Sequence, residues 1–499
     1  MASIDFNSPN NSLRQHATRG FLVTGLSQFI KFAVQTGSVV ALARLLHPVD
    51  YGLVAMVAPI FGFVMMLQDF GLTQATVQKR DITAEQVSTM FWLNLALSCA
   101  LAIILALCAP LIARFYGEAK VAPLTVAFAS LVALNGLGSQ HMALLNRQMR
   151  FGALALIDTV GAVASLMASL LFAILWDNYW ALFVGSLMLS LVPVLGSWLL
   201  VRWVPKRPAR ATGLRSILGF GGGLTGFGFA NFFARNLDNV LIGRRWGDSA
   251  LGIYDRAYKL LLLPLQQVNA PLGRVMLPIL SNLSGEPTRY SAAYCNTLRQ
   301  MLVIVLPGVV FMIATADILV PTILGHEWIA AGNVFGALGY VGLVQPLNNS
   351  SGWLFISQAR TREFMFWGIF SSITSVIAFI IGLPAGAYGV ALAYAVSEII
   401  RTPILWWVVT RSGPVKRADL LRTVAPHAAA VGISLIVAHL ARGLLSEPAV
   451  PTMALVLVLA YSSYLAVIAL FGNGRAAIAD TLSLAGSMVK RVRSTASTS

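Results

Sequence analysis

Residues 87–112 read VSTMFWLNLALSCALAIILALCAPLI and contain no charged side chain. An apolar stretch of about 20 residues, wound as a helix, is long enough to cross the hydrocarbon core of a membrane. Backbone groups in lipid must find their hydrogen bonds within their own segment, which favours a helix over other structures. We therefore predict that this stretch forms a transmembrane helix.

Similar apolar stretches recur along the whole chain of 499 residues, of which 57% are hydrophobic and only 11% are charged. A soluble domain has roughly 25% charged residues, so this chain has too few charges to cover a water-facing surface. The same length criterion predicts about fourteen transmembrane spans separated by short gaps. The predicted fold class is an all-α polytopic membrane protein.

The net charge of +16 comes from basic residues in the gaps between apolar stretches. With the N-terminus placed in the cytoplasm, most of these residues fall in cytoplasmic gaps, which is the positive-inside pattern. The outward gaps carry only Arg44, Arg114, Lys120, Arg244, Arg245 and Arg442. This distribution argues against binding of nucleic acid. It predicts that both termini are cytoplasmic and that the number of spans is even.

An internal repeat appears when the chain is shifted by 200 residues. Residues 41–44 then meet 241–244, and Gly52 meets Gly252. Parallel repeats are typical of transporters that bind substrate between two halves. The predicted organisation is a cytoplasmic tail over 1–17, an N-terminal lobe of six helices over 18–203, a cytoplasmic loop over 204–216, a C-terminal lobe of six helices over 217–410, two extra spans over 421–472 and a basic cytoplasmic tail over 473–499.

Ionisable residues inside predicted spans are costly, and they usually face a cavity or a partner. Arg235 and Asp238, Asp255 and Lys259, and Glu398 and Arg401 are spaced to form ion pairs within one helix, a packing role that competes with a functional one. Lys31 and Arg256 have no obvious partner in their own helix, which favours a role in binding an anionic substrate. The candidate cationic cavity comprises Lys31, Arg235, Arg256, Lys259 and Arg274.

Two carboxylates are candidates for ion coupling. Asp158 has no nearby cation on its own helix, and Asp238 lies within a predicted span. A carboxyl in a low-dielectric site can exchange protons near neutral pH. Asp158 could equally be the cross-helix partner of Lys31, and the sequence leaves both alternatives open. A P-loop pattern is absent, so we expect transport to use an ion gradient rather than ATP.

Signatures of enzymes are poor in this sequence. No histidine pair has metal-binding spacing, and no nucleophile elbow appears. Residues 221–226 match the dinucleotide-binding pattern G-x-G-x-x-G, but they lie within an apolar stretch, where glycines serve helix packing. We expect neither a catalytic site nor a metal or other cofactor. A drug/cation antiporter should show an excess of buried acids, and a membrane polymerase or ligase should have a large outward loop. Neither feature is present.

Several segments resemble the polysaccharide transporter branch of the multidrug/oligosaccharidyl-lipid/polysaccharide exporter superfamily, the Wzx-type flippases. The similar segments are 44–52 (RLLHPVDYG), 71–75 (GLTQA), 237–243 (LDNVLIG), 251–258 (LGIYDRAY), 269–272 (NAPL), 277–281 (LPILS) and 325–328 (GHEW). Together they cover roughly residues 15–420 in the right order, and the likeness is strongest to colanic acid and succinoglycan exporters.

The resemblance implies two six-helix lobes and alternating access to a cationic central cavity. It implies a flippase that moves an undecaprenyl-pyrophosphate-linked oligosaccharide repeat unit from the cytoplasmic to the periplasmic leaflet, for exopolysaccharide or lipopolysaccharide biosynthesis. The expected partners are this lipid-linked oligosaccharide, membrane lipids, and polysaccharide polymerase and chain-length or export proteins. The expected location is a bacterial inner membrane. The resemblance supplies no residue-level site, so the site residues rest on their charges alone.

Overall fold

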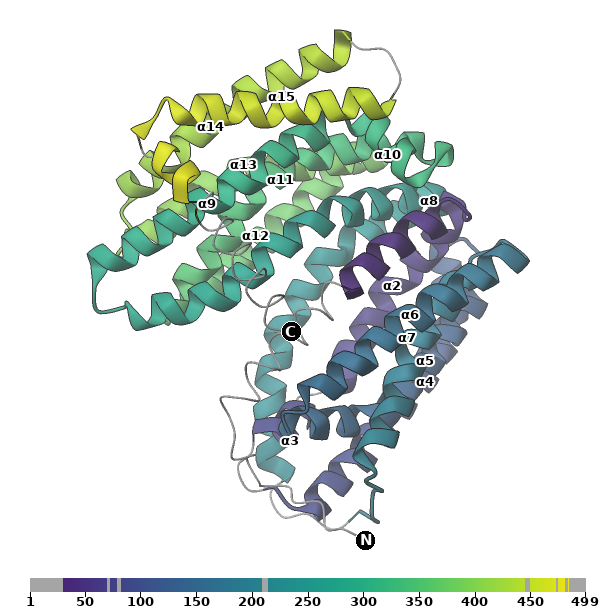
Figure 1. The fold of residues 1–499 in the computed structure, drawn as a ribbon. Coiled ribbons are helices and arrows are strands. Elements are labelled where there is room, and N and C mark those ends of the chain that lie inside the picture. Colours follow the sequence, from purple (N-terminus) through teal and green to yellow (C-terminus); the bar gives the residue numbers. More distant parts are fainter. Residues whose placement is uncertain are drawn as a thin grey trace, which may run out of the picture. The chain divides into compact units, whose positions relative to one another are not determined.

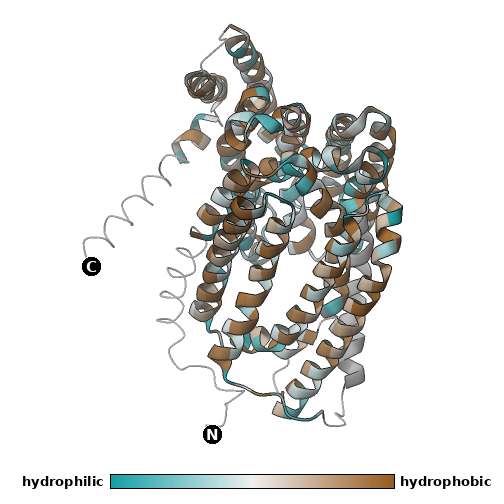
Figure 2. Ribbon diagram, turned by 90° about the vertical axis from the view of Figure 1, so that its right-hand side faces the viewer, coloured by the Kyte–Doolittle hydropathy of each residue, from teal (hydrophilic) through white to brown (hydrophobic). Residues whose placement is uncertain are grey.

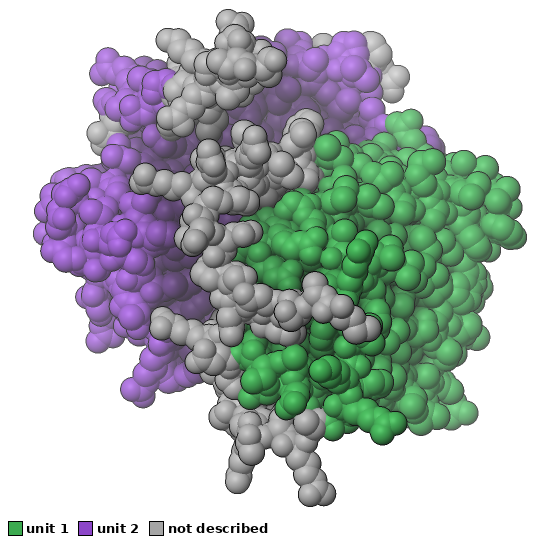
Figure 3. Space-filling model, turned by 60° about the horizontal axis from the view of Figure 1, so that its bottom comes forward, with its two compact units in different colours: residues 1–252 green, residues 253–499 purple. Residues whose placement is uncertain are grey.

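The computed structural model describes residues 30–69, 72–78, 82–208, 214–444, 449–472, 474–480 and 483, and every regular element among them is helical (Figure 1). The chain separates into two compact units, residues 1–252 and 253–499, which Figure 3 colours separately. The predicted all-α class is confirmed.

The first unit contains a helix at Ile30–Ala43 and the helices α2 (Pro48–Asp69), α3 (Leu72–Gln78), α4 (Ala84–Tyr116), α5 (Val121–Arg147), α6 (Phe151–Trp176) and α7 (Trp180–Val201). Within it α4 packs against α5, α6 packs against α7, and α5 contacts both α2 and α7. The long helix α8 (Leu214–Asn282) begins in this unit and continues into the second.

The second unit contains α9 (Pro287–Ala314), α10 (Ala316–Leu324), α11 (Ile329–Ser357), α12 (Thr361–Gly382), α13 (Gly386–Arg411), α14 (Arg417–Leu444) and α15 (Ala449–Ala469), with short 3-10 turns η1 (His326–Trp328) and η2 (Leu383–Ala385). Helix α13 packs against α11 and α12, whereas α14 and α15 pack against each other and against α9. The two C-terminal helices, predicted as extra spans, therefore belong to the second unit.

Ten helical stretches among the described residues are long and apolar enough to cross a membrane. One of them, Thr361–Arg411, contains both α12 and α13. The predicted first span corresponds to the shorter apolar helix Ile30–Ala43, and the predicted seventh and eighth spans lie within α8. The prediction of about fourteen spans thus agrees with the helices observed.

Helix α4 shows why these helices belong in lipid. Its buried face carries the polar residues Asn94 and Ser98, whereas Leu107 on the opposite face has 73% of its surface exposed. Hydrophobic residues dominate the helices of both units in Figure 2. In water such an arrangement would expose a large apolar surface, but in a bilayer the hydrocarbon chains cover it while the protein encloses the polar groups.

Local sequence signals set the ends of α4 and the break in α8. Thr83 and Gln86 form a capping box at the start of α4, and Gly117 ends it in the left-handed conformation. Helix α8 is interrupted at Gly247, whose φ of 83° and ψ of −172° are accessible almost only to glycine. This glycine separates the segments that the sequence predicts as spans 7 and 8.

A reciprocal glycine contact joins the start of α2 to the residues after Gly247. A Cβ atom at Gly52 would lie 1.8 Å from the carbonyl oxygen of Asp248, and a Cβ atom at Gly252 would lie 1.9 Å from that of Pro48. Positions 48 and 248, and positions 52 and 252, are equivalent in the 200-residue repeat. The two equivalent segments therefore contact each other. In each segment a glycine without a side chain leaves room for a backbone carbonyl of the other segment.

We predict that Gly52→Ala or Gly252→Ala destabilises the protein, because the added methyl group overlaps a backbone carbonyl and forces the two segments apart. The expected cost is about 1–3 kcal/mol. The matched control is Gly432→Ala on α14, where a Cβ atom would meet nothing within 4 Å and alanine improves helix propensity. Apparent melting temperatures of the detergent-solubilised proteins should fall for the first two variants and hold or rise for the control. Equal melting temperatures would contradict the contact.

Candidate functional site

Lys31 and Asp158 form an ion pair between two helices of the first unit. The Lys31 Nζ lies 3.2 Å from the Asp158 Oδ2. The two side chains are 31% and 43% exposed, so the pair is only partly enclosed by protein. Of the two alternatives left open for Asp158, the structure shows the cross-helix pairing. The pair holds the first helix against α6 and makes the two charges jointly neutral.

The second unit begins with a group of three charges on α8. The buried carboxylate of Asp255 accepts from Lys259 at 2.8 Å, as the spacing predicts, and from Arg256 at 2.9 Å. The second contact corrects the expectation that Arg256 has no partner in its own helix. Adjacent residues normally point away from each other on a helix, but the long arginine side chain reaches back to its neighbour. Two cations thus contact one carboxylate, and the Lys259 side chain is half exposed.

The other candidate residues on α8 differ in their surroundings. Arg235 and Arg274 are exposed, and neither forms an ion pair with another residue that the structure describes. The expected pair between Arg235 and Asp238 is therefore not seen. Asp238 is buried, and its carboxylate accepts a hydrogen bond of 2.8 Å from the backbone N–H of Asn239.

A buried polar network connects three helices of the second unit. Arg401, only 3% exposed, pairs with Glu398 as the spacing predicts. It also donates to Thr374 at 2.8 Å and to Ser375 at 2.7 Å, both on α12. Glu398 accepts in turn from the Asn348 amide of α11 at 2.8 Å. A buried charge with this many partners holds α11, α12 and α13 together.

The structure brings Lys31 to Asp158 and brings Arg256 and Lys259 to Asp255, whereas Arg235 and Arg274 join neither set. Lys31 and Asp158 lie in the first unit, together with Arg235 and Asp238 on the first half of α8. The second unit holds the other cations, Arg256, Lys259 and Arg274. A single cavity built from both groups remains a proposal. Among the described residues, no three histidine, cysteine or carboxylate side chains come close enough to hold a metal ion.

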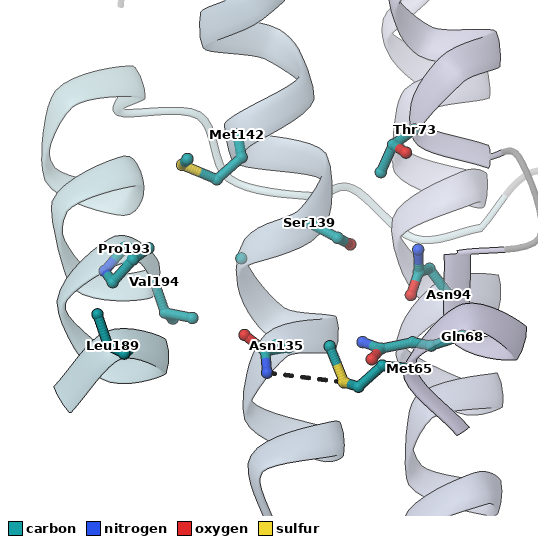
Figure 4. A pocket seen from close by; sticks show the side chains of 11 residues that line it. Met65, Gln68, Thr73, Asn94, Asn135, Ser139, Met142, Leu189, Pro193 and Val194 are labelled. Atoms are coloured by element: carbon teal, nitrogen blue, oxygen red, sulfur yellow. Dashed lines mark hydrogen bonds between the residues drawn. The ribbon is translucent and has the colours of Figure 1, made fainter. Parts of the chain in front are cut away.

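The first unit contains a pocket that the sequence alone did not predict. It has a volume of about 300 Å³ and lies between α2, α3, α4, α5 and α7 (Figure 4). Its polar lining comes from Gln68, Thr73, Asn94, Asn135 and Ser139. Each of these residues lies in or beside an apolar stretch, and amides in such places are costly unless they are paired or functional. That signal is present in the sequence, but it cannot show that the five residues converge.

Comparison with known proteins agrees with this architecture. The chain is 24% identical to the teichuronic acid biosynthesis protein TuaB of Bacillus subtilis over 70% of this chain and 72% of the relative. It is also 24% identical to the lipopolysaccharide biosynthesis protein WzxC of Escherichia coli over 80% of this chain and 82% of the relative. The fold resembles that of the lipid II flippase MurJ in an inward closed conformation, with a TM-score of 0.71 and 15% identity, covering 89% of this chain and 98% of MurJ.

A family model described as polysaccharide biosynthesis protein matches residues 41–333, which is more than half of the chain. The matched range runs from the end of the first helix to the start of α11, and so includes the paired glycines and the charged group on α8. The chain is a multi-pass membrane protein that belongs to the polysaccharide biosynthesis protein family.

Proposed function

We propose that this protein is a flippase that carries an undecaprenyl-pyrophosphate-linked oligosaccharide from the cytoplasmic to the periplasmic leaflet of a bacterial inner membrane. The product would feed exopolysaccharide or lipopolysaccharide biosynthesis. The observation that carries this proposal is the family match over residues 41–333. TuaB is named a teichuronic acid biosynthesis protein, WzxC a lipopolysaccharide biosynthesis protein and MurJ a lipid II flippase.

The charge distribution within the spans fits such a substrate. A pyrophosphate group needs donors that carry positive charge, and arginine and lysine form their strongest hydrogen bonds to phosphate oxygens away from bulk water. Arg256 and Lys259 both contact the carboxylate of Asp255, so two donors suited to phosphate oxygens lie close together here. We propose that these two residues, together with Lys31, Arg235 and Arg274, contribute to one positive cavity that holds the pyrophosphate.

The two alternative functions, a drug/cation antiporter and a membrane polymerase or ligase, gain no support from a specific observation. A drug/cation antiporter would be expected to carry free acids, but Asp158, Asp255 and Glu398 each have a cationic partner. A polymerase or ligase would need a large loop for catalytic groups. The connections between α4 and α5 (117–120) and between α6 and α7 (177–179) are only a few residues long. Polymerase and chain-length proteins instead fit as partners that take up the transported unit.

We predict that both termini are cytoplasmic, because basic residues concentrate in alternate gaps. Reporter fusions at Lys206, between the predicted sixth and seventh spans, should report a cytoplasmic location. Fusions at Asp177, between α6 and α7, should report the opposite side. A periplasmic signal at Lys206 would overturn this orientation.

We predict that Arg256→Ala lowers the rate of flipping about 10- to 100-fold, the range expected for loss of one charge-assisted hydrogen bond. Lys31→Ala should act in the same direction. Liposomes that hold purified protein and a fluorescent lipid-linked sugar would provide the measurement. The matched control is Arg289→Ala, which removes an exposed arginine paired with Glu286 at the start of α9. Normal flipping by Arg256→Ala and Lys31→Ala would refute the cavity assignment, and loss of folded protein would show a packing role.

We further propose that an ion gradient drives transport, with Asp158 or Asp238 as the coupling carboxylate. We predict that wild-type flipping accelerates when a proton or sodium gradient is imposed on the liposomes, and that Asp158→Asn abolishes this response. The double variant Lys31→Met/Asp158→Asn distinguishes a role of Asp158 in coupling the ion gradient to transport from a role in neutralising the charge of Lys31. A gradient response restored in the double variant would show that Asp158 merely neutralises Lys31. If no gradient accelerates wild-type flipping, the protein is a passive facilitator.

A further inference from the structure

The pocket in the first unit contains no charged side chain among its lining residues. Its polar groups are the amides of Gln68, Asn94 and Asn135 and the hydroxyls of Thr73 and Ser139. These polar residues come from α2, α3, α4 and α5, and α7 completes the lining, so the pocket exists only because five separate helices converge. In Figure 4 the Gln68 side chain extends from α2 toward α5, where Asn135 lies. Among the described residues the lining is therefore uncharged, and a few amide and hydroxyl groups interrupt a mostly apolar surface.

Two of these amides have buried atoms without a hydrogen-bond partner among the described residues. They are the Oε1 of Gln68, a residue 4% exposed, and the Nδ2 of Asn94, a residue with no exposed surface. An unpaired buried polar group destabilises the folded protein. One atom is an acceptor and the other is a donor. The pocket lining thus includes one unpaired acceptor and one unpaired donor.

The neighbouring groups are held in place by contacts of their own. The Asn94 Oδ1 accepts from Ser98 at 3.1 Å, and the Asn135 amide donates to the Leu131 carbonyl at 2.8 Å and to Ser190 on α7 at 3.2 Å. These bonds fix the orientation of both amides before any ligand arrives. Preorganised polar groups of this kind are characteristic of binding sites, because little ordering remains to be done on binding.

We propose that this pocket binds an uncharged sugar ring of the transported glycan, apart from the cationic residues assigned to the pyrophosphate. This inference rests on the proposed flippase function. A sugar hydroxyl both donates and accepts, so it can satisfy the Asn94 Nδ2 and the Gln68 Oε1. Met65, Met142 and Pro193 supply apolar walls for the C–H faces of the ring. The volume of about 300 Å³ would otherwise hold roughly ten waters at about 30 Å³ each.

The other ligand classes fit the pocket less well. A phosphate or a uronic acid carries negative charge, and no cation among the described residues lines the pocket to balance it. A bare sodium or potassium ion prefers a compact cage of oxygen atoms, whereas this pocket is large and mostly apolar. The neutral, mixed donor and acceptor lining therefore selects a neutral polyhydroxy ligand.

The test measures sugar binding directly. Purified protein in nanodiscs is titrated with methyl β-glucoside, methyl β-galactoside and N-acetylglucosamine, and contact is detected by saturation-transfer NMR. Gln68→Met and Asn94→Leu replace each amide with an apolar side chain of similar size. We expect at least one of these glycosides to bind the wild type and its affinity to fall about tenfold in both variants. Ser130→Ala, at an exposed position of α5 outside the pocket lining, should bind as the wild type does.

Melting temperatures show whether a variant loses glycoside binding because it lacks the amide or because it is misfolded. Each substitution removes a buried polar atom that has no partner in the unliganded protein, so melting temperatures should stay level or rise for Gln68→Met. The inference is overturned if no glycoside binds the wild type or if both variants bind as well as the wild type. It is also overturned if sodium chloride stabilises the wild type but not the variants, which would identify a cation site.

The flipping assay distinguishes this inference from the proposed function. Wild-type protein that binds a glycoside but flips no lipid-linked sugar refutes the flippase function, while the binding pocket stands on the NMR result. Wild-type protein that flips a lipid-linked sugar, together with variants that flip it equally well and bind glycosides equally well, refutes the pocket alone. If the inference is right, Gln68→Met slows flipping of a sugar-bearing lipid more than that of bare undecaprenyl pyrophosphate.

Discussion

The absence of water within the hydrocarbon core is the constraint on which the rest of this structure depends. A polar side chain that points into lipid has no partner, so it must be paired with another group or enclosed by protein. The buried Arg401 is surrounded by Glu398, Thr374 and Ser375, and Asp255 lies between two cations. Leucine and isoleucine side chains cover the outside of α4, while its asparagine and serine lie inside.

Against this background, two sets of polar groups suit a ligand. Arg256 and Lys259 place two phosphate-binding side chains beside the carboxylate of Asp255. Gln68 and Asn94 keep an unpaired acceptor and an unpaired donor without any charge. The two environments suit two chemically different parts of a lipid-linked oligosaccharide, a pyrophosphate and a sugar. Recognition of both parts would explain how such a carrier could tell a finished unit from its bare lipid.

The reciprocal contact of Gly52 and Gly252 connects the internal repeat of the sequence with the fold. Each glycine lies where a backbone carbonyl of the equivalent segment approaches too closely for a side chain. Such a self-complementary contact is what a two-fold relation between similar segments produces. The break of α8 at Gly247 allows it, because it redirects the chain immediately before Asp248. Backbone approach between small residues is a common means of packing helices in membranes.

The sequence by itself determined the helical class, the approximate number of spans, the repeat and two of the three ion pairs expected within single helices, Asp255–Lys259 and Glu398–Arg401. These features depend on hydrophobic length and on i to i+3 or i+4 spacing, which are local properties of the chain. The Lys31–Asp158 pair could be named only as one of two alternatives, and the contact of Arg256 with Asp255 was missed. The pocket of Gln68, Asn94 and Asn135 was decided by the tertiary structure alone. It depends on the rotation of each helix about its axis, which is set by packing against neighbouring helices and leaves no periodic trace in the sequence.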